Sequence, residues 1–242
     1  MSAVRTVAIV PARNEAAAIG RVVDEIRAHH PSFDVVVVDD GSSDGTGDVA
    51  RAHGAVVLRL PFNVGIGGAV QTGLRYALEE GYERAVRLDG DGQHDASQLG
   101  RLLAPLERGE ADVVVGSRFV DGGGSYRPPF ARRAGIRVFA GLVSLLGGQR
   151  VTDTTSGFVA LDRTGIKLFA AEYPHDYPEV EATLVALRSG LRLAQVQVEM
   201  RERETGSSSI TFVRSLYYLA KVTLALLVAS LRRYPRAGEA RR

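Results

Sequence analysis

Residues 87–94 read Arg-Leu-Asp-Gly-Asp-Gly-Gln-His and place two carboxylates, Asp89 and Asp91, one residue apart. They follow a short run, 84–88, that we interpret as a buried strand. Glycines beside the acids let a bulky ligand approach the backbone where the chain leaves the sheet. The two carboxylates and the Gln93 amide offer the oxygen ligands that suit Mg²⁺ or Mn²⁺ better than zinc. An acidic turn that binds no metal is the alternative interpretation.

Carboxylates also follow other expected strands in the first half of the chain. Strands are predicted at 6–10, 33–38, 56–60 and 84–88, with helical segments between them. This alternation predicts an α/β fold with a mostly parallel, Rossmann-like sheet covered by helices, which binds ligands at the carboxyl ends of its strands. Glu15 follows the first strand, and Asp39 and Asp40 end the second. We therefore expect these acids to share one crevice with Asp89 and Asp91.

The second half predicts more strands and helices, but no linker that would separate a second globular domain. Strands are expected at 112–115, up to Leu161 and at 192–198, and helices at 97–107, up to about Leu146, at 177–189 and at 212–231. A Gly- and Pro-rich loop is expected at 120–129. We divide the chain into a main domain, 1–211, and a C-terminal helix with a basic tail, 212–242.

The last expected helix carries only Arg214 and Lys221 as charges. Its apolar part, roughly 17 residues, would rise about 26 Å, short of the roughly 30 Å apolar core of a bilayer. We expect it either to lie at a membrane surface or to pack against its own domain or a second copy of the chain. The tail from Arg232 to Arg242 has five Arg and one Glu, which favours anionic lipid as a partner. A basic tail can also bind nucleic acid, but no helix combines basic residues with base-reading amides, so we do not expect nucleic acid as a partner.

Composition narrows the chemistry further. The 242 residues are 45% hydrophobic, which is enough for a substantial core, and the formal net charge is +2. The absence of Cys excludes disulfides, thiolate metal sites and cysteine nucleophiles. The first five residues lack the apolar core of a signal peptide. We expect a cytoplasmic protein that lies peripherally on the inner face of the plasma membrane.

The motifs together resemble the family-2 glycosyltransferases with the GT-A fold, and within them the dolichol-phosphate mannose synthase branch. The resemblance covers nearly the whole chain. It rests on Pro11-Ala12-Arg13-Asn14-Glu15, VVVVDDGSSDGT at 35–46, Asn63-Val64-Gly65-Ile66-Gly67, LDGDGQH at 88–94, Gly116-Ser117-Arg118-Phe119, DTTSGF at 153–158 and Arg203-Glu204-Thr205-Gly206-Ser207-Ser208.

The resemblance implies a role for each matching residue. A nucleotide-sugar donor would be held by Pro11, Arg13, Glu15, Asp39, Asp40 and Asp89, with Asp40 as the acceptor of a hydrogen bond from the base. Asp89, Asp91 and Gln93 would hold the Mg²⁺ or Mn²⁺ ion, and Arg203 would close over the donor diphosphate. Asp91 and Arg203 would be catalytic because they stabilise the charge that builds on the departing diphosphate.

The acceptor remains open between two chemistries. An inverting transfer from a GDP- or UDP-sugar to a polyprenyl phosphate needs little help from a base, whereas transfer to a sugar hydroxyl needs a carboxylate to take its proton. Asp153 is the candidate base, and the alternative is that it positions the loop before Phe158. Arg118, Arg132 and Arg133 either bind an acceptor phosphate or are solvated surface residues. An alternative that is not an enzyme is a non-catalytic, nucleotide-sugar-binding subunit of a membrane assembly.

Overall fold

A computed structural model describes residues 4–120, 130–201 and 212–237 of the chain. Within these residues, seven strands form one sheet in the order β3-β2-β1-β4-β6-β5-β7. Their bounds are β1 Thr6–Ala12, β2 Asp34–Asp39, β3 Val56–Arg59, β4 Arg84–Arg87, β5 Val113–Ser117, β6 Val159–Asp162 and β7 Leu193–Gln197. The predicted α/β architecture is confirmed.

One strand departs from the parallel pattern. β6 runs antiparallel to both β4 and β5, whereas β1, β2, β3 and β4 pair in parallel and β5 pairs in parallel with β7. The direction of a short apolar run cannot be inferred from its composition, because both directions bury the same side chains. The reversal brings the residues before β6 to the same sheet edge as the residues after β4.

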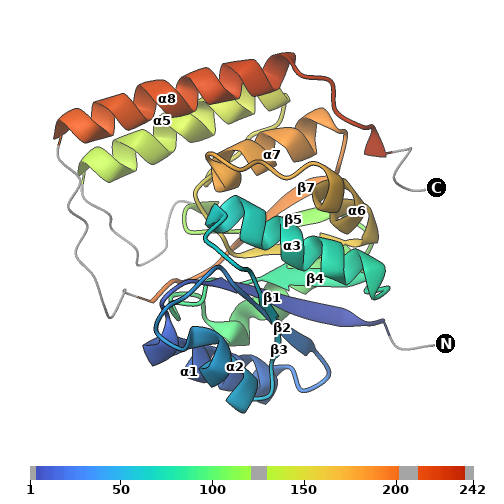
Figure 1. The fold of residues 1–242 in the computed structure, drawn as a ribbon. Coiled ribbons are helices and arrows are strands. Elements are labelled where there is room, and N and C mark those ends of the chain that lie inside the picture. Colours follow the sequence, from blue (N-terminus) through green and yellow to red (C-terminus); the bar gives the residue numbers. More distant parts are fainter. Residues whose placement is uncertain (1–3, 121–129, 202–211, 238–242) are drawn as a thin grey trace.

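Helices cover both faces of the sheet, as Figure 1 shows. Alternate strand residues, such as Ala8 and Val10, pack against α1 (Ala16–His29), α2 (Thr46–Ala52) and α4 (Leu99–Glu107). The intervening residues, such as Val7 and Ile9, pack against α3 (Gly65–Glu79), α6 (Arg163–Ala171) and α7 (Pro178–Arg188). A two-residue period of this kind is what a buried strand imposes. The helix α6 was not predicted from the sequence, and a single 3-10 turn, Ala96–Gln98, precedes the helix expected at 97–107.

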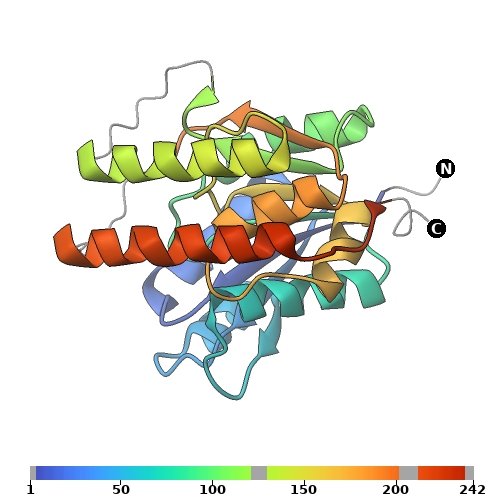
Figure 2. The same ribbon diagram turned by 90° about the horizontal axis from the view of Figure 1, so that it is seen from above.

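A third layer lies outside α7. α5 (Phe130–Gly147) and α8 (Phe212–Leu231) run side by side in both ribbon views (Figures 1 and 2). Phe139 and Val143 of α5 form a small apolar core with Leu184 of α7 and with Val222 and Leu226 of α8. The C-terminal helix therefore packs against its own domain along one face. None of the helices in the described residues has the length and apolar character needed to cross a membrane.

Candidate active site

The candidate site lies at the carboxyl ends of β1, β2 and β4. Pro11 and Ala12 end β1, and the backbone N–H of Asp40 donates to the Ala12 carbonyl over 3.0 Å. On the other side of β1, a Cβ placed on Gly90 would lie 3.0 Å from the Ala12 Cβ. Asp40 and the 89–93 loop therefore flank the same strand end, which parallel pairing in this strand order requires.

The loop after β1 is held by the loop after β2. Asn14 has a positive φ of 55°, and its side-chain oxygen accepts the Ser43 N–H over 2.9 Å. The Asp44 carboxylate accepts N–H groups from Ala16 and Thr46. Burial alone would raise the pKa of Asp44, but hydrogen bonds from Thr46 and Ala16 hold it below its usual value. These hydrogen bonds give the DGSSDGT motif a structural role, because they hold the loop after β1 against the loop after β2.

Two of the residues predicted to bind the nucleotide lie in the loop after β1, where Arg13 is exposed and Glu15 is half-buried.

The Asp39 and Asp40 side chains are both buried and both bonded to protein groups. Asp39 is 1% exposed and pairs with the Arg59 guanidinium over 3.2 Å. The two Asp40 carboxylate oxygens accept the N–H groups of Val64 and Gly65, at 2.7 and 3.0 Å, where α3 begins. Anions are stabilised at such a position because the first N–H groups of a helix have no helical partner. Asp40 thus orders the loop before α3, and its contact with a base stays a prediction.

The 89–93 loop is shaped by its own side chains. Asp91 accepts the Gln93 backbone N–H over 3.0 Å, and the Gln93 amide donates to its second oxygen. The Asp89 N–H donates to His94 Nδ1 over 3.0 Å, which places the imidazole proton on Nε2. His94 is buried and stacks on Phe158 with ring centroids 4.9 Å apart. Burial lowers the pKa of His94 and so favours the neutral ring.

The side-chain oxygens of this loop suit a hard cation that also binds water or phosphate oxygens. Asp89 is 34% exposed, and Asp91 and Gln93 are half-buried. In the part of the chain that the structure describes, no three His, Cys, Asp or Glu side chains form a metal-binding group. Two carboxylates and an amide, if all three bound one ion, would leave positions for water and phosphate oxygens. Mg²⁺ and Mn²⁺ in nucleotide sites are bound in this way, through few protein ligands.

Asp153 and Arg118 are brought together as a buried ion pair. Asp153 is fully buried, and the Arg118 guanidinium donates to both of its oxygens, at 2.8 and 2.9 Å. Burial alone would raise the pKa of Asp153, but Arg118 holds it below its usual value. The Thr155 N–H donates to the same carboxylate over 3.0 Å. This geometry favours the positioning role for Asp153, and acceptor binding by Arg118 stays a prediction.

The remaining predicted residues lie around this centre or outside the described part. The Arg201 N–H donates to the Gln93 carbonyl over 2.9 Å, and its guanidinium forms two 2.7 Å bonds with Glu25. The chain therefore runs beside the 89–93 loop immediately before residue 202. Arg203 and the Arg132 side chain lie outside the described residues, while Arg133 is exposed in the first turn of α5.

Sequence reasoning missed Arg87, Phe158 and Glu179 as parts of the site. Phe158 backs the loop through His94, and Arg87 bonds to both Asp89 and Glu179. The available signal was an arginine inside a segment predicted as a buried strand, because a charge at a buried position requires a partner. No signal in the sequence pointed to Glu179, which is 92 positions away from Arg87.

The chain is similar in sequence to proteins of a known family. The family model described as "Glycosyl transferase family 2" matches residues 7–169. An undecaprenyl-phosphate mannosyltransferase of Micrococcus luteus is 36% identical over 217 residues, which cover 86% of this chain and 88% of the relative. A polyprenol monophosphomannose synthase of Mycolicibacterium smegmatis is 31% identical over 219 residues, covering 86% of this chain and 81% of the relative.

The fold also matches a solved structure. Glucosyl-3-phosphoglycerate synthase of Mycobacterium tuberculosis, solved with Mn²⁺, UDP and glucosyl-3-phosphoglycerate, superimposes with a TM-score of 0.72 at 23% identity, over 94% of this chain and 80% of that one. This likeness supports the predicted GT-A fold. Because the family model covers well over half of the chain and the relatives match nearly its full length, the chain belongs to glycosyl transferase family 2.

Proposed function

We propose that the protein transfers a hexose, with inversion, from a GDP- or UDP-sugar to a polyprenyl phosphate. The observation that carries this proposal is the 89–93 loop, which presents two carboxylates and an amide where the ends of β1, β2 and β4 meet. The relatives named above, an undecaprenyl-phosphate mannosyltransferase and a polyprenol monophosphomannose synthase, support the lipid-phosphate acceptor.

In the proposed reaction, an acceptor phosphate oxygen attacks the anomeric carbon from the face opposite the leaving diphosphate. The bond from that carbon to the diphosphate oxygen breaks, and the nucleoside diphosphate leaves with the electron pair. Asp89, Asp91 and Gln93 would hold Mg²⁺ or Mn²⁺, which when bound neutralises charge on the leaving group. Arg203 is proposed to add a second positive charge there.

A phosphate acceptor also fits the state of Asp153. This carboxylate is fully buried and bonded to Arg118, so it is not placed to take a proton from an entering hydroxyl. An acceptor that is already an anion needs no such step. The exposed Arg133, with Arg132 beside it in the chain, is proposed to bind the acceptor phosphate at the start of α5.

The experiment that tests this function is a turnover screen of GDP- and UDP-sugars with Mn²⁺, with and without a short-chain polyprenyl phosphate. We expect the lipid phosphate to accelerate donor consumption on the order of 100-fold, because a positioned nucleophile replaces water. Product should appear as glycosyl lipid phosphate. Equal donor consumption without the lipid, together with transfer to a free sugar, would instead indicate a hydroxyl acceptor.

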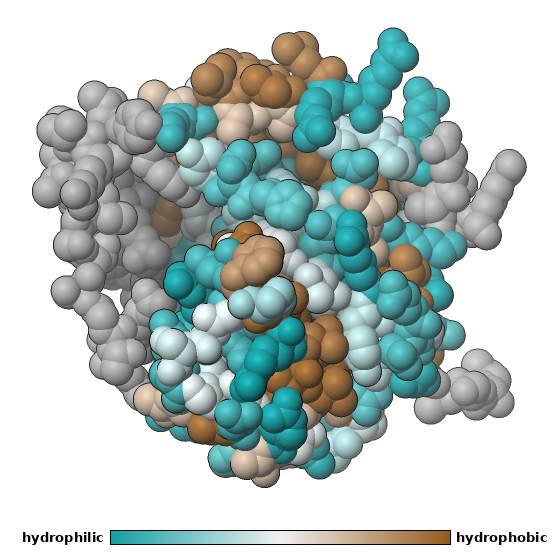
Figure 3. All heavy atoms as spheres, in the orientation of Figure 1, coloured by the Kyte–Doolittle hydropathy of each residue, from teal (hydrophilic) through white to brown (hydrophobic). Residues whose placement is uncertain are grey.

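An exposed apolar face on α8 suggests how a lipid acceptor is reached. Leu224, Leu227, Val228 and Leu231 are exposed, Leu224 by 63%, although the opposite face of the helix is buried. Figure 3 shows apolar side chains gathered over this end of the molecule. Arg232, Arg233 and Arg236 follow immediately and are exposed. An apolar face beside cations is what a helix at an anionic membrane surface presents.

Flotation with phosphatidylcholine vesicles, with and without phosphatidylglycerol, should detect this association. We expect binding to require the anionic lipid, and the double variant Leu227→Asp, Val228→Asp to lose it by about tenfold or more. Val4→Asp, at another exposed valine, is the matched control. If the double variant floats as well as the wild type, α8 does not form the proposed membrane-binding surface.

A further inference from the structure

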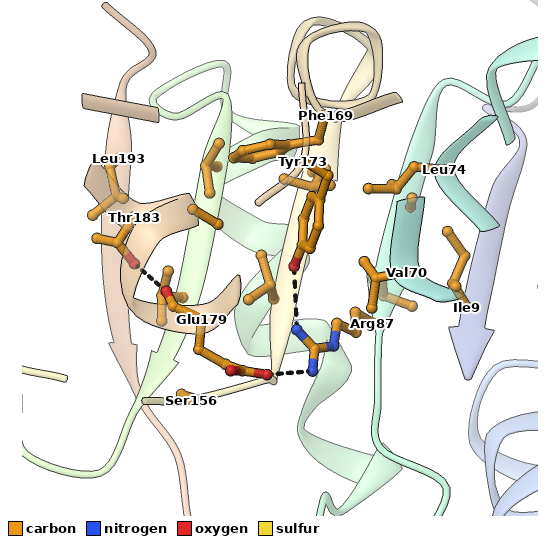
Figure 4. A pocket seen from close by; sticks show the side chains of 17 residues that line it. Ile9, Val70, Leu74, Arg87, Ser156, Phe169, Tyr173, Glu179, Thr183 and Leu193 are labelled. Atoms are coloured by element: carbon orange, nitrogen blue, oxygen red, sulfur yellow. Dashed lines mark hydrogen bonds and ion pairs between the residues drawn. The ribbon is translucent and has the colours of Figure 1, made fainter. Parts of the chain in front are cut away.

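Arg87 is a buried arginine directly behind the candidate cation-binding loop. Its side chain is 7% exposed, and it forms three interactions. Nη2 lies 2.8 Å from Glu179 Oε1 and 3.2 Å from Asp89 Oδ1, and Nη1 lies 3.2 Å from the Tyr173 hydroxyl. Figure 4 shows the guanidinium between Tyr173 and Glu179. One cation thus joins Asp89 to side chains from α7 and from the segment after α6.

The surroundings of Arg87 offer it few other partners. It lies at one end of a cavity of about 40 Å³ whose other lining residues are mainly aliphatic or aromatic, including Val70, Leu74 and Phe169 (Figure 4). The guanidinium cannot rotate towards these apolar side chains without losing its hydrogen bonds. An arginine side chain stays protonated in proteins, so the charge is kept. The three interactions therefore fix its position.

Gly157 covers the same carboxylate from another direction. A Cβ on Gly157 would lie 2.9 Å from Asp89 Oδ1, 3.0 Å from Asp89 Oδ2 and 3.0 Å from Arg87 Nη2. A real side chain there would press directly on the Asp89–Arg87 contact, because a Cβ is essentially never found within 3.0 Å of another group and the distance to Asp89 Oδ1 is 2.9 Å. Since φ at Gly157 is not positive, the glycine is explained by space rather than by backbone conformation.

We propose that Arg87, anchored by Glu179 and Tyr173, is a positioning residue that fixes the plane of the Asp89 carboxylate for binding the donor diphosphate with its cation. The inference rests on the proposed function, in which Asp89 contacts the donor and the metal. Residues that orient a metal-binding carboxylate typically change metal affinity about 10- to 100-fold when they are replaced. Arg87 touches neither the donor nor the cation in this role.

The test measures the contribution of Mn²⁺ to nucleotide affinity. GDP and UDP are titrated calorimetrically with and without Mn²⁺. For each variant we take the ratio of the Kd without Mn²⁺ to the Kd with Mn²⁺, so that a large ratio means that the metal tightens nucleotide binding. We expect Arg87→Met to lower this ratio about tenfold while metal-free affinity stays constant. Arg87→Lys should fall between wild type and Arg87→Met, because an ammonium cannot reproduce the planar fork of a guanidinium. A purely structural role would not change the ratio selectively.

Arg84→Met is the matched control. Arg84 lies on the same strand and pairs with Glu107 over 3.0 Å, but it has no contact with the 89–93 loop among its hydrogen bonds and ion pairs in the described residues. Gly157→Ala disturbs Asp89 while leaving the Arg87 charge intact, and it should lower the ratio in the same direction. It also decides the outcome should Arg87→Met fail to fold, as judged by circular dichroism.

The two proposals fail differently. If wild type binds neither nucleotide more tightly with Mn²⁺, the proposed function is wrong. If wild type shows the metal effect and the Arg87 and Gly157 variants keep the full ratio, Arg87 is not a positioning residue although the function stands. A ratio lowered equally in Arg84→Met would also overturn the inference, because the effect would then follow from losing any arginine on β4.

Discussion

Replacing Asp91 by alanine is expected to lower kcat/KM for sugar transfer by about 10²- to 10³-fold, because the departing diphosphate loses stabilisation of its charge. Asp91 belongs to the loop after β4, and its carboxylate bonds to Gln93 through both oxygens. The alanine variant removes one proposed cation ligand and also the group that holds a second. Initial rates at several Mn²⁺ concentrations, with the cognate donor from the turnover screen, measure the effect.

Asp24→Asn provides the control for the loss of a carboxylate. Asp24 is an exposed residue of α1 that pairs with His53 over 2.9 Å, on a helix that covers the opposite face of the sheet from α3. Its variant should keep the wild-type rate and the wild-type Mn²⁺ dependence. If Asp91→Ala also kept both, Asp91 could not be a cation ligand, and the metal-assisted mechanism would lose its main support.

The second large effect concerns stability. Asp153→Asn should lower the free energy of unfolding by about 3–5 kcal/mol, because the buried Arg118 charge is left without its counter-ion. Urea denaturation at neutral pH measures this loss. Glu110→Gln removes the charge from an exposed pair with Arg108 and should change stability little. A loss for Asp153→Asn no greater than that control would mean that the pair does not fasten the 153–158 segment.

The same pair predicts a pH dependence. The folded-state pKa of Asp153 lies below its ordinary value of 3.8. Its contribution to stability is therefore complete above the unfolded-state pKa and is lost as the pH falls through the lower folded-state value. The stability difference between wild type and Asp153→Asn should stay constant through neutral and mildly acidic solution and shrink only in strong acid. A difference that shrinks already near neutral pH would contradict the ion pair.

Much of the fold could be predicted because short segments of the sequence contain the signals for individual strands and helices. Runs of β-branched residues, as at 35–38, mark buried strands, and acids directly after them mark a ligand-binding edge. The reversal of β6 had no such local signal, since it depends on which neighbours the strand meets. The helix α6 was missed although Asp162 caps its start by accepting the Gly165 N–H over 2.8 Å.

The site was predicted in outline but not in the state of its side chains. Asp40 and Asp153 were identified as acids of the right motifs, yet both are buried and hold backbone groups. Whether a carboxylate faces a ligand or the protein depends on partners that are distant in sequence, such as Val64 for Asp40. Arg87 illustrates the same limit, because its anchor Glu179 comes from α7, 92 positions away in the sequence.

The reversed direction of β6 also bears on how such a chain can diversify. β5 ends at Ser117 and β6 starts at Val159, and both points lie at the same sheet edge, where Ser117 and Thr152 are hydrogen-bonded over 2.8 Å. The excursion between them, including α5, leaves and returns at neighbouring points. The part of this segment that lies outside the candidate site can therefore change in length or composition, while the register of β1, β2 and β4 stays untouched.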